Sequence, residues 1–69
     1  MNDVPNYIIK AIKNFLFDIG YNDIKSIAPT DLGNSYEIYI KLNQGRGLFY
    51  SISKQKIIKY VIKEKIKVI

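Results

Sequence analysis

The chain of 69 residues contains no cysteine, no histidine and no tryptophan, and only two prolines. Without cysteine it can form neither a disulfide nor a thiolate metal site. Without histidine it also lacks a common zinc ligand and the side chain that performs most general acid-base catalysis near neutral pH. We therefore predict no metal and no cofactor, and a core held together by side-chain packing alone.

Carboxylates and hydroxyls are the remaining candidates for catalysis. Six acids are scattered over the chain, and no two of them have a spacing that predicts a shared site. Ser51 and Ser53 have no histidine to activate them as nucleophiles. We therefore predict that the protein is not an enzyme.

The length of the chain limits it to one small domain over residues 1–69, which buries only about 60% of the surface that the unfolded chain exposes. Hydrophobic residues make up 48% of the chain, which favours a folded globule over a disordered tail. No apolar run approaches the roughly 20 residues that a membrane span needs, and the first ten residues lack the features of a signal peptide. We predict a cytoplasmic protein.

Positive charge is concentrated in the second half of the chain. Residues 1–37 carry three lysines and five acids, a net charge of −2, whereas residues 38–69 carry eight basic residues and one acid, a net charge of +7. This asymmetry points to a polyanionic partner, either nucleic acid or an anionic membrane. A solvated face that keeps a small protein soluble would produce the same pattern.

A helix is predicted over residues 4–19. Apolar residues recur at positions 8, 9, 12, 15, 16 and 19, which is the spacing of one helix face. Asp3 can cap the start of this helix, and Pro5 suits its first turn because no amide donor is needed there. Gly20 suits a left-handed stop.

Three strands are predicted after the helix. The first covers about residues 23–28, and a loop follows over residues 29–34, where turn-forming residues cluster. The second, SYEIYIKL at residues 35–42, alternates between polar and apolar side chains, with the even-numbered positions directed to the core. Glycines in NQGRG, residues 43–47, predict a tight reversal, so the third strand, LFYSIS at residues 48–53, should lie antiparallel to the second.

This hairpin is expected to place two aromatic rings outside the core. If the even-numbered residues of the third strand face the core, Phe49 lies on the outer face of the sheet near Tyr39. An exposed aromatic pair beside Lys41 can stack on a base or on a partner's side chain, so we predict Tyr39 and Phe49 as an interaction surface. The alternative is that the rings only pack across the strands and stabilise the hairpin.

Residues 54–69 are predicted to form a second, basic helix. Apolar residues at positions 58, 61, 62, 66 and 69 have helical spacing, and lysines fill most of the gaps. We expect this apolar stripe to pack against the sheet, with Ser53 as the N-cap. The many β-branched residues leave a fourth strand as the alternative. The predicted fold is therefore α+β, with an N-terminal helix, a three-stranded antiparallel sheet and a C-terminal basic helix (αβββα).

Several basic residues are predicted to contact an anion. A helix N-terminus carries partial positive charge, so Lys54 and Lys56 in the first turn are unfavourable unless an anion is held there by the lysines and the free amides. The lysines one and two turns further along extend the same face. Arg46 at the hairpin tip can reach a phosphate with its planar guanidinium. A lysine-rich protein that places lysine everywhere outside its core would look the same. The predicted nucleic-acid-binding set comprises Lys41, Arg46, Lys54, Lys56, Lys59 and Lys63.

The segment ISKQKIIKYVI, residues 52–62, carries a family resemblance. A serine followed by lysines at the start of the last helix resembles the double-stranded RNA-binding domain, which has the same order of elements. The resemblance covers nearly the whole chain and implies that Lys54 and Lys56 contact phosphates across a groove. The order is also similar to that of the HicA toxins, which cleave RNA with a catalytic histidine. This chain has no histidine, so that resemblance implies only a non-catalytic relative.

The leading interpretation is a small non-catalytic protein that binds RNA or DNA through phosphates, without strong sequence choice. The alternative is a protein-interaction module, for example a viral or mobile-element protein that blocks or recruits a host factor. A homodimer would also compensate for the small core, because pairing of two copies buries further apolar surface. A third interpretation, in which residues 54–69 lie on an anionic membrane, ranks last because folding is expected to need the apolar stripe. No membrane partner is predicted.

Overall fold

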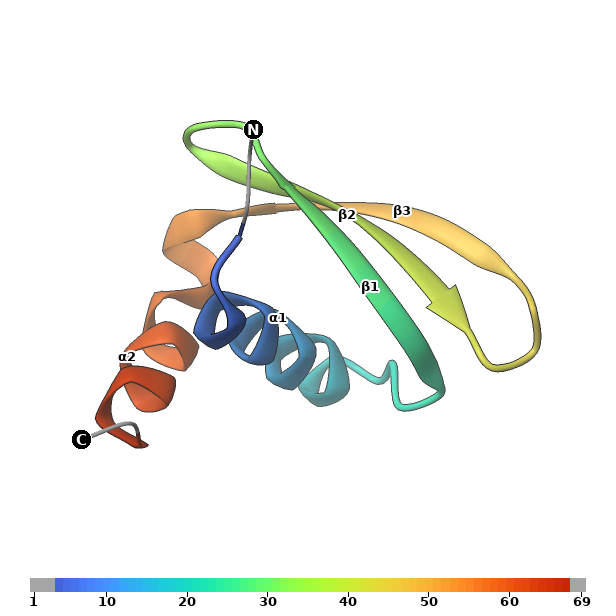
Figure 1. Ribbon diagram of the computed structural model, residues 1–69, viewed down its shortest axis with the longest axis horizontal. Coiled ribbons are helices and arrows are strands. Elements are labelled where there is room, and N and C mark those ends of the chain that lie inside the picture. Colours follow the sequence, from blue (N-terminus) through green and yellow to red (C-terminus); the bar gives the residue numbers. More distant parts are fainter. Residues whose placement is uncertain (1–3, 68–69) are drawn as a thin grey trace.

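The computed structural model describes residues 4–67. It contains a helix, three strands and a second helix that follows a short 3-10 turn (Figure 1). The elements are α1 (Asn6–Asp18), β1 (Ile24–Asp31), β2 (Ser35–Leu42), β3 (Gly47–Ser53), the 3-10 turn η1 (Lys54–Ile57) and α2 (Ile58–Lys67). The strands form one antiparallel sheet in the order β1-β2-β3. The predicted α+β class and αβββα order are confirmed.

The core lies between α1 and one face of the sheet. Four residues of the apolar face predicted for the first helix, Ile8, Ile12, Phe15 and Leu16, are buried, together with Ala11. The other two predicted positions are not: Ile9 is half-buried and Ile19, just past the helix, is 46% exposed. The even-numbered residues of β2 and β3 supply the other side, with Tyr36, Ile38, Ile40 and Ile52 at 6% exposure or less. The two periods, about 3.6 residues in the helix and 2 in the strands, therefore direct the apolar side chains to the same core.

Both ends of α1 have a local explanation. Pro5 is the N-cap and has an extended backbone, so it precedes the first turn instead of lying in it. The predicted cap Asp3 lies outside the described residues. Gly20 has a φ of 111°. Its N–H donates to the carbonyl of Phe17 at 3.1 Å and the N–H of Tyr21 donates to that of Leu16 at 2.9 Å, which are the two bonds of a Schellman motif.

The first strand is longer than predicted. β1 continues through Pro29 to Asp31, so the predicted loop is wrong over residues 29–31 and is confirmed only over residues 32–34, where the chain reverses. Pro29 pairs with Ile38 of β2. Because β1 is an edge strand, it needs ladder hydrogen bonds on one side only, and proline is tolerated there.

The C-terminal segment is helical, but its buried side is not the predicted one. Ser53 caps η1 as expected, because its hydroxyl accepts a hydrogen bond from the Lys56 N–H at 3.3 Å. The residues expected to pack on the sheet are exposed instead: Ile58 by 56%, Ile62 by 51% and Ile66 by 63%. Of that predicted stripe only position 61 is half-buried, and position 69 lies outside the described residues. The expectation that folding needs the whole stripe is therefore wrong.

The rotation of α2 is fixed by its contacts with α1, against which it packs (Figure 1). Ile57, at 0% exposure, enters the core just before α2 begins. The Tyr60 hydroxyl donates to Asp18 Oδ2 at 2.8 Å, and this bond raises the pKa of Tyr60. Asn14 Nδ2 donates to Glu64 Oε2 at 2.9 Å. Apolar residues lie on two sides of α2, so periodicity could not choose between them. Neither helix within residues 4–67 is long and apolar enough to cross a membrane.

Candidate nucleic-acid interface

The outer face of the sheet carries an exposed aromatic pair. Tyr39 of β2 lies directly opposite Phe49 of β3, and their ring centroids are 5.0 Å apart with an interplanar angle of 53°. Phe49 is 69% exposed and Tyr39 is 39% exposed. The helices lie on the other face of the sheet (Figure 1), so within residues 4–67 no helix covers the outer face, to which the alternation directs these rings. Their predicted placement outside the core is confirmed.

Gly47 makes room for the ring of Tyr39. A Cβ atom at position 47 would come within 2.7 Å of Tyr39 Cζ and 3.0 Å of Cε1. Gly47 is not among the glycines with positive φ, so its backbone does not require glycine. The Tyr39 ring lies over this position, and a larger residue would displace the ring. The glycine therefore positions Tyr39 over the start of β3, beside Phe49.

Lys41 borders the aromatic pair, and Arg46 lies in the adjoining turn. Lys41 lies two residues along β2 from Tyr39, on the same face, and pairs with Gly47. Arg46 lies in the turn that precedes β3. Both side chains are exposed, and in the described part of the chain neither forms a salt bridge. The face thus combines aromatic rings with the charge of Lys41. Arg46 adjoins this face from the turn, at a position that the alternation from Gly47 does not assign to it.

The neighbours of the rings on β1 are small, and one exposed carboxylate, Glu37, lies on the same face of β2. Ala28 of β1 pairs with Tyr39, and Ser26 pairs with Lys41. On the far side of the aromatic pair from the turn, Glu37 pairs with Ser51. No bulky neighbour on these paired positions blocks access to the rings.

Lys54 is engaged with an acid of the protein itself. Its Nζ lies 2.8 Å from Asp31 Oδ1 and 4.9 Å from the centroid of the Tyr36 ring. The hydrogen bond from Lys54 lowers the pKa of Asp31, helped by the Gly33 N–H, and the same bond raises the pKa of Lys54. The carboxylate of Asp31 therefore supplies the anion at the start of the helical segment. The sequence had predicted that a bound ligand would supply it.

The predicted basic residues do not form one cluster. Lys56, Lys59 and Lys63 are exposed along η1 and α2. The seven residues of β3 separate this group from Arg46, and at about 3.3 Å per residue the two ends of the strand are roughly 20 Å apart. Lys41 belongs with Arg46 and the aromatic pair. The structure therefore divides the predicted set between the hairpin end of the sheet and the C-terminal helix.

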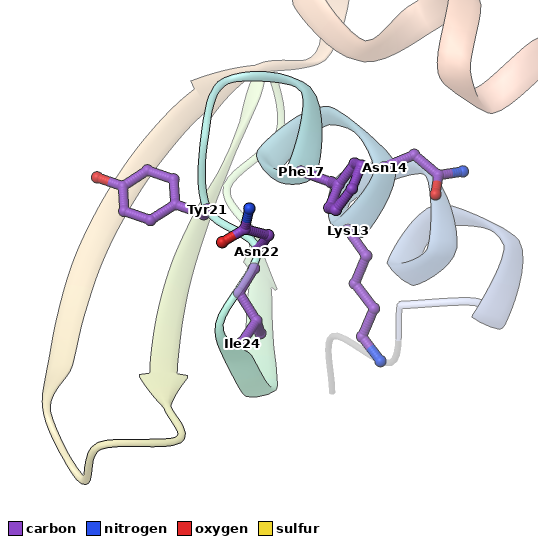
Figure 2. A pocket seen from close by; sticks show the side chains of 6 residues that line it. All are labelled: Lys13, Asn14, Phe17, Tyr21, Asn22 and Ile24. Atoms are coloured by element: carbon purple, nitrogen blue, oxygen red, sulfur yellow. The ribbon is translucent and has the colours of Figure 1, made fainter.

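A hollow of about 260 Å³ lies between the end of α1 and the start of β1 (Figure 2). It is smaller than the roughly 300 to 1,000 Å³ that small-molecule sites have. In Figure 2 the Tyr21 hydroxyl, the Lys13 amine and the Asn14 amide point in different directions, so these groups do not converge on a ligand position. Within residues 4–67 no group of three acidic side chains is placed to hold a metal ion.

Two contributors to these sites were not predicted from the sequence. The alternation that placed Phe49 on the outer face also places residue 47 there, so a role for Gly47 beside Tyr39 could have been inferred. The pairing of Asp31 with Lys54 could not, because the residues are 23 positions apart and meet only through the length of β1 and the register of the sheet.

Comparison with known protein families, with curated proteins and with solved structures finds no match to this chain. The resemblances to the double-stranded RNA-binding domain and to the HicA toxins therefore rest on the order of elements and on residues 52–62, and they remain predictions.

Proposed function

We propose that the protein binds nucleic acid through the outer face of its sheet. Unpaired bases stack on Phe49 and Tyr39, and Lys41 and Arg46 hold the adjacent phosphates. The observation that carries this proposal is the exposure of the aromatic pair, with Phe49 at 69%, beside Lys41 on the same face and next to the turn that holds Arg46. Neither cation has a salt-bridge partner among residues 4–67.

Aromatic stacking suits a single strand better than a duplex. Base stacking on an aromatic side chain contributes about 1 to 3 kcal/mol per base and tolerates any sequence, because every base has a π face. In a duplex these faces are covered by neighbouring base pairs, so only unpaired nucleotides can use Phe49 and Tyr39. The proposed ligand class is therefore single-stranded RNA or DNA, held without strong sequence choice.

Electrostatics sets the expected strength and salt dependence of this complex. Two phosphate contacts, from Lys41 and Arg46, predict that the logarithm of the association constant falls with the logarithm of salt concentration with a slope of about −1.4. Together with one or two stacked bases this gives weak binding, in the micromolar range or above.

Fluorescence anisotropy with labelled oligonucleotides tests the proposal. We expect single strands of about 10 nucleotides to bind at low salt and a blunt duplex of similar length to bind less well. Phe49→Ala should weaken single-strand binding by about 1 to 3 kcal/mol, whereas Tyr39→Phe, which keeps the ring, should have a small effect. Lys41→Glu should weaken binding and flatten the salt dependence.

The matched control is Lys59→Glu with Lys63→Glu on α2, which leaves the sheet unchanged. If this control abolishes binding while Phe49→Ala does not, the nucleic-acid site lies on the C-terminal helix and the proposal is wrong. Absence of binding by any oligonucleotide at low salt would also reject it.

A further inference from the structure

The solvent side of α2 carries a row of exposed isoleucines. Ile58, Ile62 and Ile66 recur every fourth residue, so they lie within about 80° of arc on one side of the helix. Each is more than half exposed, from 51% to 63%. Most of the surface of these side chains is not used by the fold, and three large apolar residues in a row are typical of an interaction surface.

Lysines border this row on both sides. Lys59 and Lys63 follow Ile58 and Ile62 by one position, so they form a parallel row along one edge. Lys65 lies along the other edge, with its ammonium 5.4 Å from the centroid of the Tyr7 ring. Within α2 the one acid, Glu64, is 5% exposed and faces α1, where it accepts a hydrogen bond from Asn14. The flanks of the isoleucine row are therefore positively charged.

A narrow apolar row with charged flanks is the pattern of a helix-pairing seam. In paired helices, apolar residues fill the seam and the flanking positions choose the partner by charge. Helices that lie on membranes usually bury a wider apolar face that carries tryptophan, phenylalanine or leucine, and α2 has none of these residues. The row on α2 thus matches a helical partner better than a lipid surface.

The charges also argue against a second copy of this chain. If two copies paired through the isoleucine rows, the lysines of both would line the same seam, and no exposed acid on α2 would oppose them. Like charges in a seam disfavour pairing.

We propose that α2 docks an amphipathic helix of another protein that has an apolar seam and acidic flanks. The isoleucine row enters the partner's seam, and Lys59, Lys63 and Lys65 face its glutamates or aspartates. Only ten residues of α2 are involved, so the interface is small and the complex is transient. This surface lies apart from the aromatic face of the sheet, so the proposal is independent of the proposed nucleic-acid binding.

Two designed peptides of about 20 residues test the proposal. Both have leucine and isoleucine at the seam positions; one has glutamate at every flanking position and the other has lysine. Repulsion between identical flanks keeps each peptide from pairing with itself. We expect the glutamate peptide to bind the full chain in titration calorimetry and the lysine peptide to bind at least about tenfold more weakly.

Substitutions on the exposed face should not disturb folding, which circular dichroism will check. Ile58→Gln with Ile62→Gln should abolish binding of the glutamate peptide, and Phe49→Ala on the sheet should leave it unchanged. Lys59→Glu with Lys63→Glu should reverse the preference in favour of the lysine peptide.

Four outcomes would overturn the proposal. If the glutamate peptide does not bind, or if both peptides bind equally, the partner is not a helix with acidic flanks. If the protein sediments with phosphatidylserine vesicles and the Ile58→Gln, Ile62→Gln variant does not, the partner of the isoleucine row is a membrane and not a helix. If light scattering shows that the protein is a dimer and that the same variant is a monomer, the partner is a second copy of this chain.

Discussion

Lys54 Nζ lies 2.8 Å from Asp31 Oδ1 and 3.0 Å from Asp31 Oδ2, and this pair joins the start of the C-terminal helical segment to the end of β1. Both side chains are 38% exposed, so the pair lies at the edge of the fold and not in its core. Lys54 also lies over the Tyr36 ring, which packs in the core. The pair adds to the backbone hydrogen bond from the Lys54 N–H to the Asn34 carbonyl, 3.0 Å long, where the sheet ends and the helical segment begins.

This pair predicts a pH-dependent contribution to stability. The folded-state pKa of Asp31 is below its ordinary value of 3.8, so the contribution is present above that value and is lost as pH falls through the lower folded pKa. The folded-state pKa of Lys54 is above 10.5, so the contribution is lost again as pH rises through that higher pKa.

Asp31→Asn measures this contribution, because asparagine can still accept the hydrogen bond from the Gly33 N–H while losing the charge. We expect the difference in urea midpoint between the protein and the variant to be constant near neutral pH and to vanish at acidic and strongly alkaline pH. A difference that persists unchanged at acidic pH would show that the charge of Asp31 is not its source.

Adjacent isoleucines test the rotation of the C-terminal segment. Ile57 is 0% exposed, so Ile57→Ala should lower the free energy of unfolding by about 2 to 5 kcal/mol. Ile58 is 56% exposed, and Ile58→Ala should change it by less than about 0.5 kcal/mol, since alanine also has the higher helix propensity. Urea denaturation measures both. Equal losses, or a larger loss for Ile58→Ala, would contradict the observed packing of α2.

The hydrogen bond between Asn14 and Glu64 predicts coupling between the two helices. Asn14→Ala removes a donor from a carboxylate that is 5% exposed, and we expect a loss of about 1 to 3 kcal/mol in the free energy of unfolding. A double-mutant cycle with Glu64→Ala should give a coupling of about 0.5 to 3 kcal/mol. Additive effects of the two substitutions would mean that the bond does not hold α2 against α1.

Substitution of Gly47 is expected to change binding without changing stability. In Gly47→Ala the new Cβ displaces the Tyr39 ring at the surface. Alanine also loses less backbone entropy on folding than glycine does, which favours the folded state. We expect single-strand binding to weaken about tenfold with little change in the free energy of unfolding. Anisotropy and urea denaturation on the same preparation measure the two quantities. Unchanged binding would show that the position of Tyr39 does not matter for the ligand.

Local patterns in the sequence were sufficient to predict most of the fold. The helical period in residues 6–18 and the alternation in residues 35–42 each define a single apolar face, so only one arrangement buries it. Gly20 and Ser53 marked a helix stop and a helix start because their preferences act through neighbouring backbone groups. The outer placement of Tyr39 and Phe49 followed from the same alternation.

The tertiary structure decided what local pattern left open. α2 has apolar residues on two sides, and contacts of Tyr60 and Glu64 with α1 determined that Ile57 is buried while Ile58 and Ile62 face solvent. The division of the basic residues between two surfaces, and the pairing of Lys54 with Asp31, depend on where the ends of β1 and β3 lie in the assembled sheet. Residues far apart in sequence meet only when the sheet and helices pack, so their contacts leave no periodic signal in the chain itself.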